Sequence, residues 1–137
     1  MRDRIDIHHS VPSVTPAEMY QDIGASGTTA AVAARVLDAR ERQRARFAGM
    51  PWLTNSGVPG YEFRRRCALS ADASRPLQTE MVNGRLTQRG ADRVVRMAWT
   101  VADLRRRDRP DEECVREALA LRSDGVSGES ARRGRVS

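Results

Sequence analysis

Three arginines, Arg89, Arg93 and Arg96, have the side chains and the spacing in this chain that could do chemistry. On a helix they lie along one face, because residues three or four positions apart are neighbours there. A guanidinium stays charged and offers paired N–H donors in a planar fork, so a row of them on a rigid helix can bind a phosphate or another oxyanion. The residues also leave open a simpler interpretation, a cationic face that only contacts solvent.

The helix that must carry these arginines is predicted to begin after Thr87 and to run to Leu104. At about 100° per residue, apolar and polar side chains separate onto opposite sides. The apolar side comprises Ala91, Val94, Val95, Ala98, Val101 and Ala102. The polar side comprises Arg89, Arg93, Arg96, Thr100, Asp103 and Arg107. Thr87 is placed to cap the helix, and Gly84 to end the element before it.

The basic residues are all arginine: the chain has 24 of them in 137 residues and no lysine. A phosphate-loop lysine, a Schiff-base lysine and a lysine general base are therefore excluded. The net charge of +6 favours an anionic partner such as nucleic acid or a nucleotide phosphate. Aromatic residues make up only 4% of the chain, a composition that favours packed helices over a β-sandwich.

Cys67 and Cys114 are far apart and lack metal-binding spacing, so they predict buried thiols in a reducing compartment. No stretch approaches the roughly 20 apolar residues of a membrane span, and the N-terminus lacks the apolar core of a signal peptide. His8 and His9 are adjacent and would point to opposite faces of a strand, so no metal site is predicted. These observations predict a cytoplasmic protein without a membrane partner.

Two stretches resemble a known family. The run Leu86–Leu104, LTQRGADRVVRMAWTVADL, followed by RDRP at 107–110 and VREALALR at 115–122, resembles the C-terminal helical domain of magnesium-chelatase-like AAA+ ATPases of the YifB/ComM type. The segment Asp3–His8, DRIDIH, is similar to the segment that ends the ATPase core in that family. The chain thus resembles about the last quarter of such an ATPase.

The resemblance implies roles for four arginines. It makes Arg4 an arginine finger that acts in trans on the nucleotide of a neighbouring ring subunit, where the alternative is a salt bridge to Asp3 or Asp6. It makes Arg89 the nucleotide-sensing arginine of the helical lid domain, with Arg93 and Arg96 following along the same face. The full-length family binds ATP and Mg²⁺ and is expected to form a hexameric ring with neighbouring subunits. This chain has no phosphate loop and no paired acidic residues for Mg²⁺, so we expect no ATP hydrolysis and no bound cofactor in the chain alone.

The predicted fold is mainly α, in four parts. Residues 1–14 are a short strand belonging to the AAA+ core, with Ile5 and Ile7 on one face. Residues 15–60 are linking helices and a loop: a short helix from Thr15, a long one from Thr28 or Thr29 to Ala48, and a loop whose Trp52 is expected to dock on a neighbouring domain. Residues 61–122 are the lid bundle, and 123–137 a disordered tail.

One helix in the lid bundle contains a proline. Pro76 is tolerated only in a first turn, so the helix that contains it is predicted to begin near Ser74.

Three functions fit this sequence. The first is the C-terminal part of a YifB/ComM-type ATPase, which supplies finger and sensing arginines for ATP-driven remodelling of DNA. The second is a free-standing arginine-rich helical module that binds nucleic acid without sequence preference. The third is a fragment of a true magnesium-chelatase motor protein.

Overall fold

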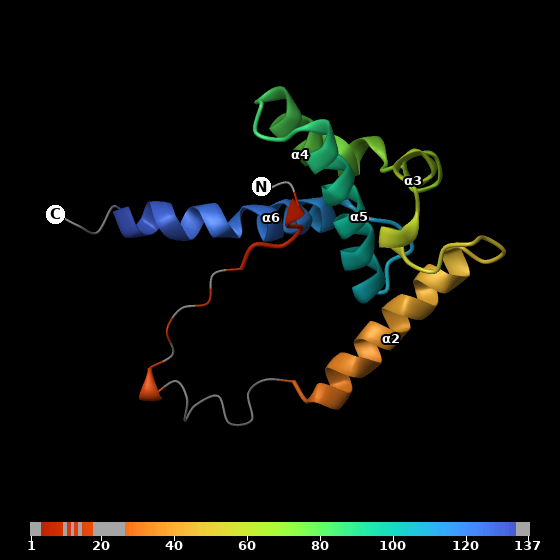
Figure 1. Ribbon diagram of the computed structural model, residues 1–137, viewed down its shortest axis with the longest axis horizontal. Coiled ribbons are helices and arrows are strands. Elements are labelled where there is room, and N and C mark those ends of the chain that lie inside the picture. The colour runs from red at the N-terminus through yellow and green to blue at the C-terminus, as the bar shows by residue number, and fades with distance from the viewer. Residues whose placement is uncertain (1–3, 10, 12, 14, 18–26, 134–137) are drawn as a thin grey trace.

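The computed structural model describes residues 4–9, 11, 13, 15–17 and 27–133, and side chains as far as Ser123. Its elements are helices (Figure 1): α2 (Thr29–Arg46), α3 (Gly60–Arg66), α4 (Ala71–Val82), α5 (Gln88–Leu104) and α6 (Glu112–Arg133), with a short 3₁₀ helix, η2 (Asn55–Gly57). The prediction of a mainly helical chain is confirmed.

Helix α5 lies at the centre of the bundle and packs against α2, α4 and α6. Its predicted apolar side is the buried side, as the period of 3.6 residues requires. One core cluster joins helices α4, α5 and α6. It contains Ala73 and Leu77 of α4, Ala91, Val94, Ala98, Val101 and Ala102 of α5, and Cys114, Val115 and Ala118 of α6. The predicted cap is also present, because Thr87 Oγ1 accepts a hydrogen bond of 3.1 Å from the Gly90 N–H.

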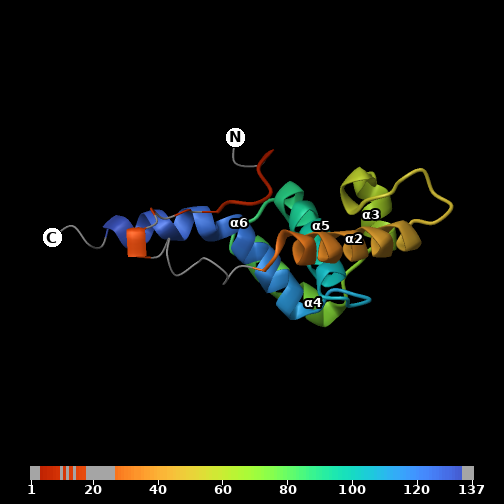
Figure 2. The same cartoon turned by 90° about the horizontal axis from the view of Figure 1, so that it is seen from below.

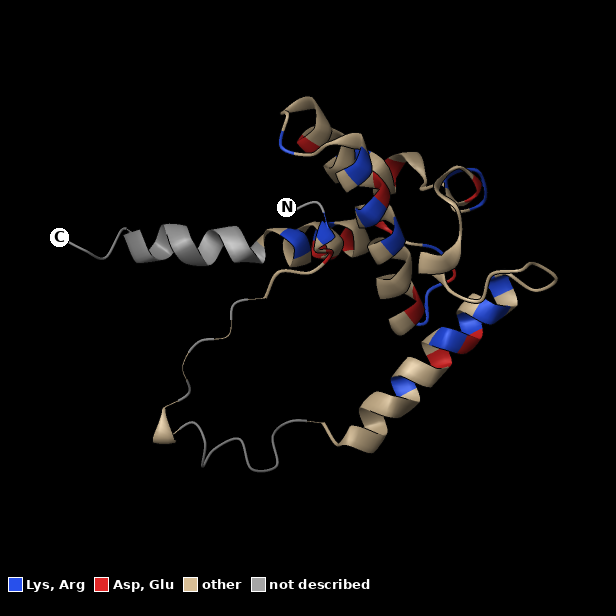
Figure 3. Ribbon diagram, in the orientation of Figure 1, with Lys and Arg blue, Asp and Glu red and all other residues tan. Residues whose placement is uncertain are grey.

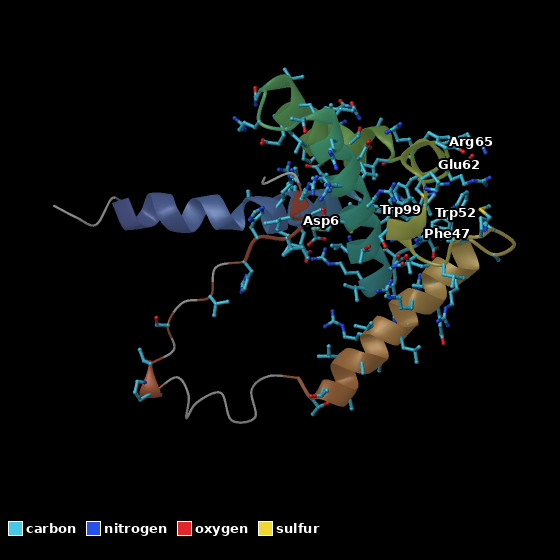
Figure 4. The ribbon with its side chains drawn as sticks, in the orientation of Figure 1. Asp6, Phe47, Trp52, Glu62, Arg65 and Trp99 are labelled. Carbon is cyan, nitrogen blue, oxygen red and sulfur yellow. The ribbon has the colours of Figure 1, made fainter. Side chains whose placement is uncertain are left out.

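A second core cluster fixes the end of α2 and the helix α3 to α5. It contains Phe47, Val58, Phe63, Cys67 and Trp99. The Trp99 indole Nε1 donates a 2.8 Å hydrogen bond to the Cys67 carbonyl, so the polar edge of the ring is satisfied in the interior. Trp52 is half-buried and packs on this cluster, and Figure 4 shows it beside Phe47 and Trp99. The prediction that Trp52 docks on a different domain is therefore wrong for this structure.

Helix α2 has the predicted start and a slightly earlier end. Thr28 Oγ1 accepts from the Ala31 N–H at 3.2 Å, which confirms the cap. The helix ends at Arg46 and not at Ala48, and Gly49 follows with φ of 78°. This left-handed conformation is easily reached only without a Cβ atom, so Gly49 allows the chain to turn toward Trp52.

Helix α4 begins earlier than predicted. Ser70 caps it by accepting from the Ala73 N–H at 3.2 Å, so Pro76 lies inside the helix and not in its first turn. Proline removes one intrahelical hydrogen bond at that point. Pro76 is buried together with Ala73 and Leu77, and this packing, with the Ser70 cap, offsets the lost bond.

The N-terminal end of the chain also differs from the predictions. Residues 5–9 form no strand in the structure, because the described part of the chain offers them no second strand to pair with. Of the short helix predicted from Thr15, only Pro16 and Ala17 are described as helical, and its remainder lies outside the described residues.

In both views α6 extends past the bundle (Figures 1 and 2), and its backbone continues to Arg133 through the segment predicted as a tail. No proline after Pro110 interrupts its hydrogen bonds.

Candidate functional site

Arg89 is the second residue of α5 and is exposed to solvent. Its guanidinium makes no ion pair or hydrogen bond with any residue that the structure describes. The side chain stands on the first turn of a helix that is anchored along its opposite face by Ala91, Val94 and Ala98. Arg89 is therefore a charged group with available donors on a rigid support.

Arg93, one turn further along, is half-buried and forms an ion pair with Asp6. Asp6 belongs to the extended N-terminal segment, which lies against α5 and α6 (Figure 4). A second contact holds the segment, since the His8 N–H donates to the Leu121 carbonyl at 2.8 Å. The guanidinium of Arg93 thus attaches the segment that carries Arg4 to the helix that carries Arg89.

Arg96, like Arg93, is half-buried. It donates to the Asn55 carbonyl and lies over the Phe63 ring, with its central carbon 4.6 Å from the ring centroid. Burial lowers the pKa of this guanidinium from its ordinary value, because desolvation disfavours the charged form. Arg96 connects α5 to η2 and α3, and its donors are directed into the protein.

Arg4 is exposed at the start of the described chain. Of the two partners that the sequence suggests for it, Asp6 is bound to Arg93, and Asp3 lies outside the described residues. Arg4 makes no ion pair or hydrogen bond with a described residue. Figure 3 shows the resulting distribution of basic residues on α5 and on the N-terminal segment.

Beneath the cationic face lies a buried polar network centred on Asp103. The Asp103 carboxylate is fully buried and accepts two hydrogen bonds from Arg46, one of them at 3.1 Å, and one from the Asn55 amide at 3.2 Å. Arg46 also stacks on Trp99, 4.4 Å from the ring centroid. The prediction that Asp103 belongs to the solvated polar side of the helix is wrong, because its charge is neutralised by an arginine from α2.

The sequence did not identify the residues that bind Arg93 and Arg96 in the structure. The sequence suggests Asp6 only as a partner of Arg4, and it places Asn55 in a loop without a role. One signal was present in the sequence: Asp103 follows directly after the buried pair Val101 and Ala102, near the edge of the apolar side. A carboxylate at such an edge can be buried against an opposite charge, but the sequence shows neither that Asp103 is buried nor which residue pairs with it.

No group of three or more His, Cys, Asp or Glu side chains in the described residues could hold a metal ion. None of the described helices is long and apolar enough to cross a membrane.

Comparisons with known proteins identify the family. Residues 26–122 match the family model for the C-terminal domain of ChlI, a subunit of magnesium chelatase. An uncharacterized protein of Mycobacterium tuberculosis is 35% identical over 124 residues, which cover 90% of this chain and 24% of the relative. YifB of Salmonella typhimurium is 29% identical and YifB of Escherichia coli 26%, each over 88% of this chain and 23% of the relative. The chain therefore spans about a quarter of the length of these curated relatives. No solved structure matches.

Proposed function

Since this chain belongs to the family of magnesium chelatase C-terminal domains, as a C-terminal part of a YifB-type protein, we propose that it is a helical lid that contacts a bound nucleotide. The ATPase core that holds the nucleotide would lie in the three quarters of the relatives that this chain does not cover. In this proposal ATP hydrolysis needs both parts, and the chain alone does not turn ATP over.

The observation that carries the proposal is the state of Arg89. Its guanidinium is exposed and without a described partner, on a helix whose other side is packed in the core. The backbone at Arg89 is already ordered by the helix, so only the side chain must be immobilised on binding, and its guanidinium can donate two hydrogen bonds to phosphate oxygens. Arg89 would contact the terminal phosphate, and removal of that phosphate would release the lid.

The other predicted arginines take different parts in this proposal. Arg93 is already paired with Asp6, so it would act mainly by holding the N-terminal segment. Arg96 would support α5 through the Asn55 carbonyl and Phe63. Arg4, which is exposed, would act in trans as the arginine finger for a neighbouring protomer of the ring.

The residues present fit a nucleotide phosphate but not its metal ion. Exposed guanidiniums are suited to phosphate oxygens, whereas the described residues bring together no carboxylate cluster that could ligate Mg²⁺. The proposal therefore assigns Mg²⁺ to the ATPase core. ATP with Mg²⁺ supplies the phosphoryl group whose loss drives remodelling, and DNA is the proposed substrate.

The test is ATP turnover in a chimera in which this chain replaces the matching region of the M. tuberculosis relative. Arg89→Ala should lower turnover about 10- to 100-fold, the value of one or two hydrogen bonds to a charged group. Arg109→Ala, in the loop between α5 and α6, removes another exposed arginine without a described partner and should leave turnover unchanged. Equal turnover in the parent chimera and the Arg89 variant would exclude the proposed role.

A second candidate function is non-specific nucleic-acid binding. Arg40 and Arg44 lie one turn apart on α2, both exposed and both without a described partner. If these arginines bind phosphates, the affinity of the chain for duplex DNA will fall steeply as salt rises. Replacing both by alanine should then reduce the salt slope by about two, one for each lost phosphate contact.

A further inference from the structure

The exposed apolar residues of this chain gather near its N-terminal end. Among the described residues, the large hydrophobic side chains exposed to solvent are Ile5, Ile7, Val11, Val32, Val36, Leu37, Leu53, Tyr61 and Val82. Six of these nine precede residue 38. Scattered apolar side chains are normal at a protein surface, whereas a group of them on one element indicates an interaction site.

Helix α2 contains the most regular part of this group. Ala39, Gln43 and Phe47 form the stripe by which the second half of α2 packs on the bundle, and each is at most 4% exposed. The same stripe continues toward the helix start at Val36 and Val32, four residues apart, which are 46% and 51% exposed. Leu37 widens this apolar surface. The packing face of α2 is therefore longer than the bundle that covers it (Figure 1).

We propose that the first half of α2, through Val32, Val36 and Leu37, is the docking face for the ATPase core of the longer protein. The inference rests on the proposed function, because it takes the core to be the part of the relatives that this chain does not cover. Two observations favour this occupant. The stripe is continuous with an interface inside the domain, and the relatives are about four times longer than the region matched here. An apolar patch on the core, beside α2, would complete the stripe.

The flanks of this face indicate the chemistry of its partner. Arg35, Arg40 and Arg44 are exposed on α2 and have no described partner. An apolar patch bordered by carboxylates on the core would match both the stripe and these guanidiniums. The core is thus expected to present acidic residues at the edge of its apolar contact.

The test is hydrogen exchange in residues 29–38, measured in the free 137-residue chain and in the chimera with the M. tuberculosis relative. We expect fast exchange in the free chain and at least about 10-fold slower exchange in the chimera, because docking must open before these amides exchange. Val36→Asp should remove the added protection. Val32→Asp should do the same, and circular dichroism of each free variant checks that α2 still forms.

The controls separate this inference from the proposed function. Val82→Asp changes a side chain that is 85% exposed on α4 and should keep the protection. Arg89→Ala should also keep the added protection of residues 29–38. If this variant loses ATP turnover but keeps the protection, the nucleotide contact is affected and the docking of α2 is not. No added protection in the chimera would overturn the inference. The inference would also be overturned if residues 29–38 were protected in the free chain, to a degree that rises with protein concentration and is lost in Val36→Asp. The occupant of the face would then be a second copy of this chain.

Discussion

Replacing Asp103 by alanine should destabilise this domain more than any exposed substitution. The carboxylate is fully buried and accepts from Arg46 and Asn55, and the Arg46 side chain is only 18% exposed. Removing the carboxylate leaves a guanidinium without its charge partner in a region mostly shielded from water. Breaking one side of such a buried pair costs about 3–5 kcal/mol. That loss is a large share of the roughly 5–15 kcal/mol by which domains are stable.

A matched control is the exposed pair between Arg75 and Asp72, whose side chains are 71% and 79% exposed. Its two charges remain in water whether or not they meet, so Asp72→Ala should cost at most about 1 kcal/mol. A second control replaces both buried partners, Arg46→Met with Asp103→Leu. This double variant should recover part of the lost stability, because no unpaired charge remains, although the buried Asn55 side chain loses its hydrogen bonds to both residues.

Urea unfolding followed by tryptophan fluorescence and by circular dichroism measures these differences. Trp99 contacts both Arg46 and the second core cluster, so its emission should change when the network opens. The expected result is a midpoint shift several times larger for Asp103→Ala than for Asp72→Ala, with similar slopes. Equal shifts for the two variants would show that the Arg46–Asp103 pair does not hold α2 to α5.

Two further predictions concern helix α6 and the thiols. Asp111 accepts from the Cys114 N–H at 2.9 Å, and this bond is the main reason that the pKa of Asp111 is below its ordinary value. The stabilising contribution of the ionised Asp111 is therefore complete above the unfolded pKa of about 4 and is lost as pH falls through the lower folded pKa. Asp111→Asn keeps a side-chain oxygen that can accept from the Cys114 N–H but does not titrate. The free energy of unfolding of this variant should therefore change less with pH below about pH 4 than that of the parent. Cys67 and Cys114 are buried, and burial raises the pKa of both thiols, so a thiol reagent should modify neither residue in the native protein and both in denaturant. Rapid native modification at a rate independent of denaturant would contradict their positions in the two core clusters.

The central helix was predictable because its signals are local. The 3.6-residue period of Val94, Ala98 and Val101 identifies the buried face, and Thr87 marks the start, without knowledge of any distant residue. The early start of α4 was not predictable in this way. Pro76 normally marks a first turn, and only tertiary burial explains its place in the helix interior.

The partners of the arginines were not predictable because they are distant in sequence. Arg93 binds Asp6, 87 residues away, and Asp103 binds Arg46, 57 residues away. A polar side chain at the edge of a helix face has the same pattern whether it meets water or a buried opposite charge. The pattern could therefore identify the arginine row but could not tell that Arg89 is available while Arg93 and Arg96 are held.

The role proposed for Arg89 is a contact with the terminal phosphate of a nucleotide held by the ATPase core. The most direct measurement is the affinity of the chimera for a non-hydrolysable ATP analogue and for ADP, with and without Arg89→Ala. The variant should lose about 10-fold or more in affinity for the ATP analogue and should bind ADP as the parent does. Equal losses for both nucleotides, or no loss for either, would contradict the proposed role.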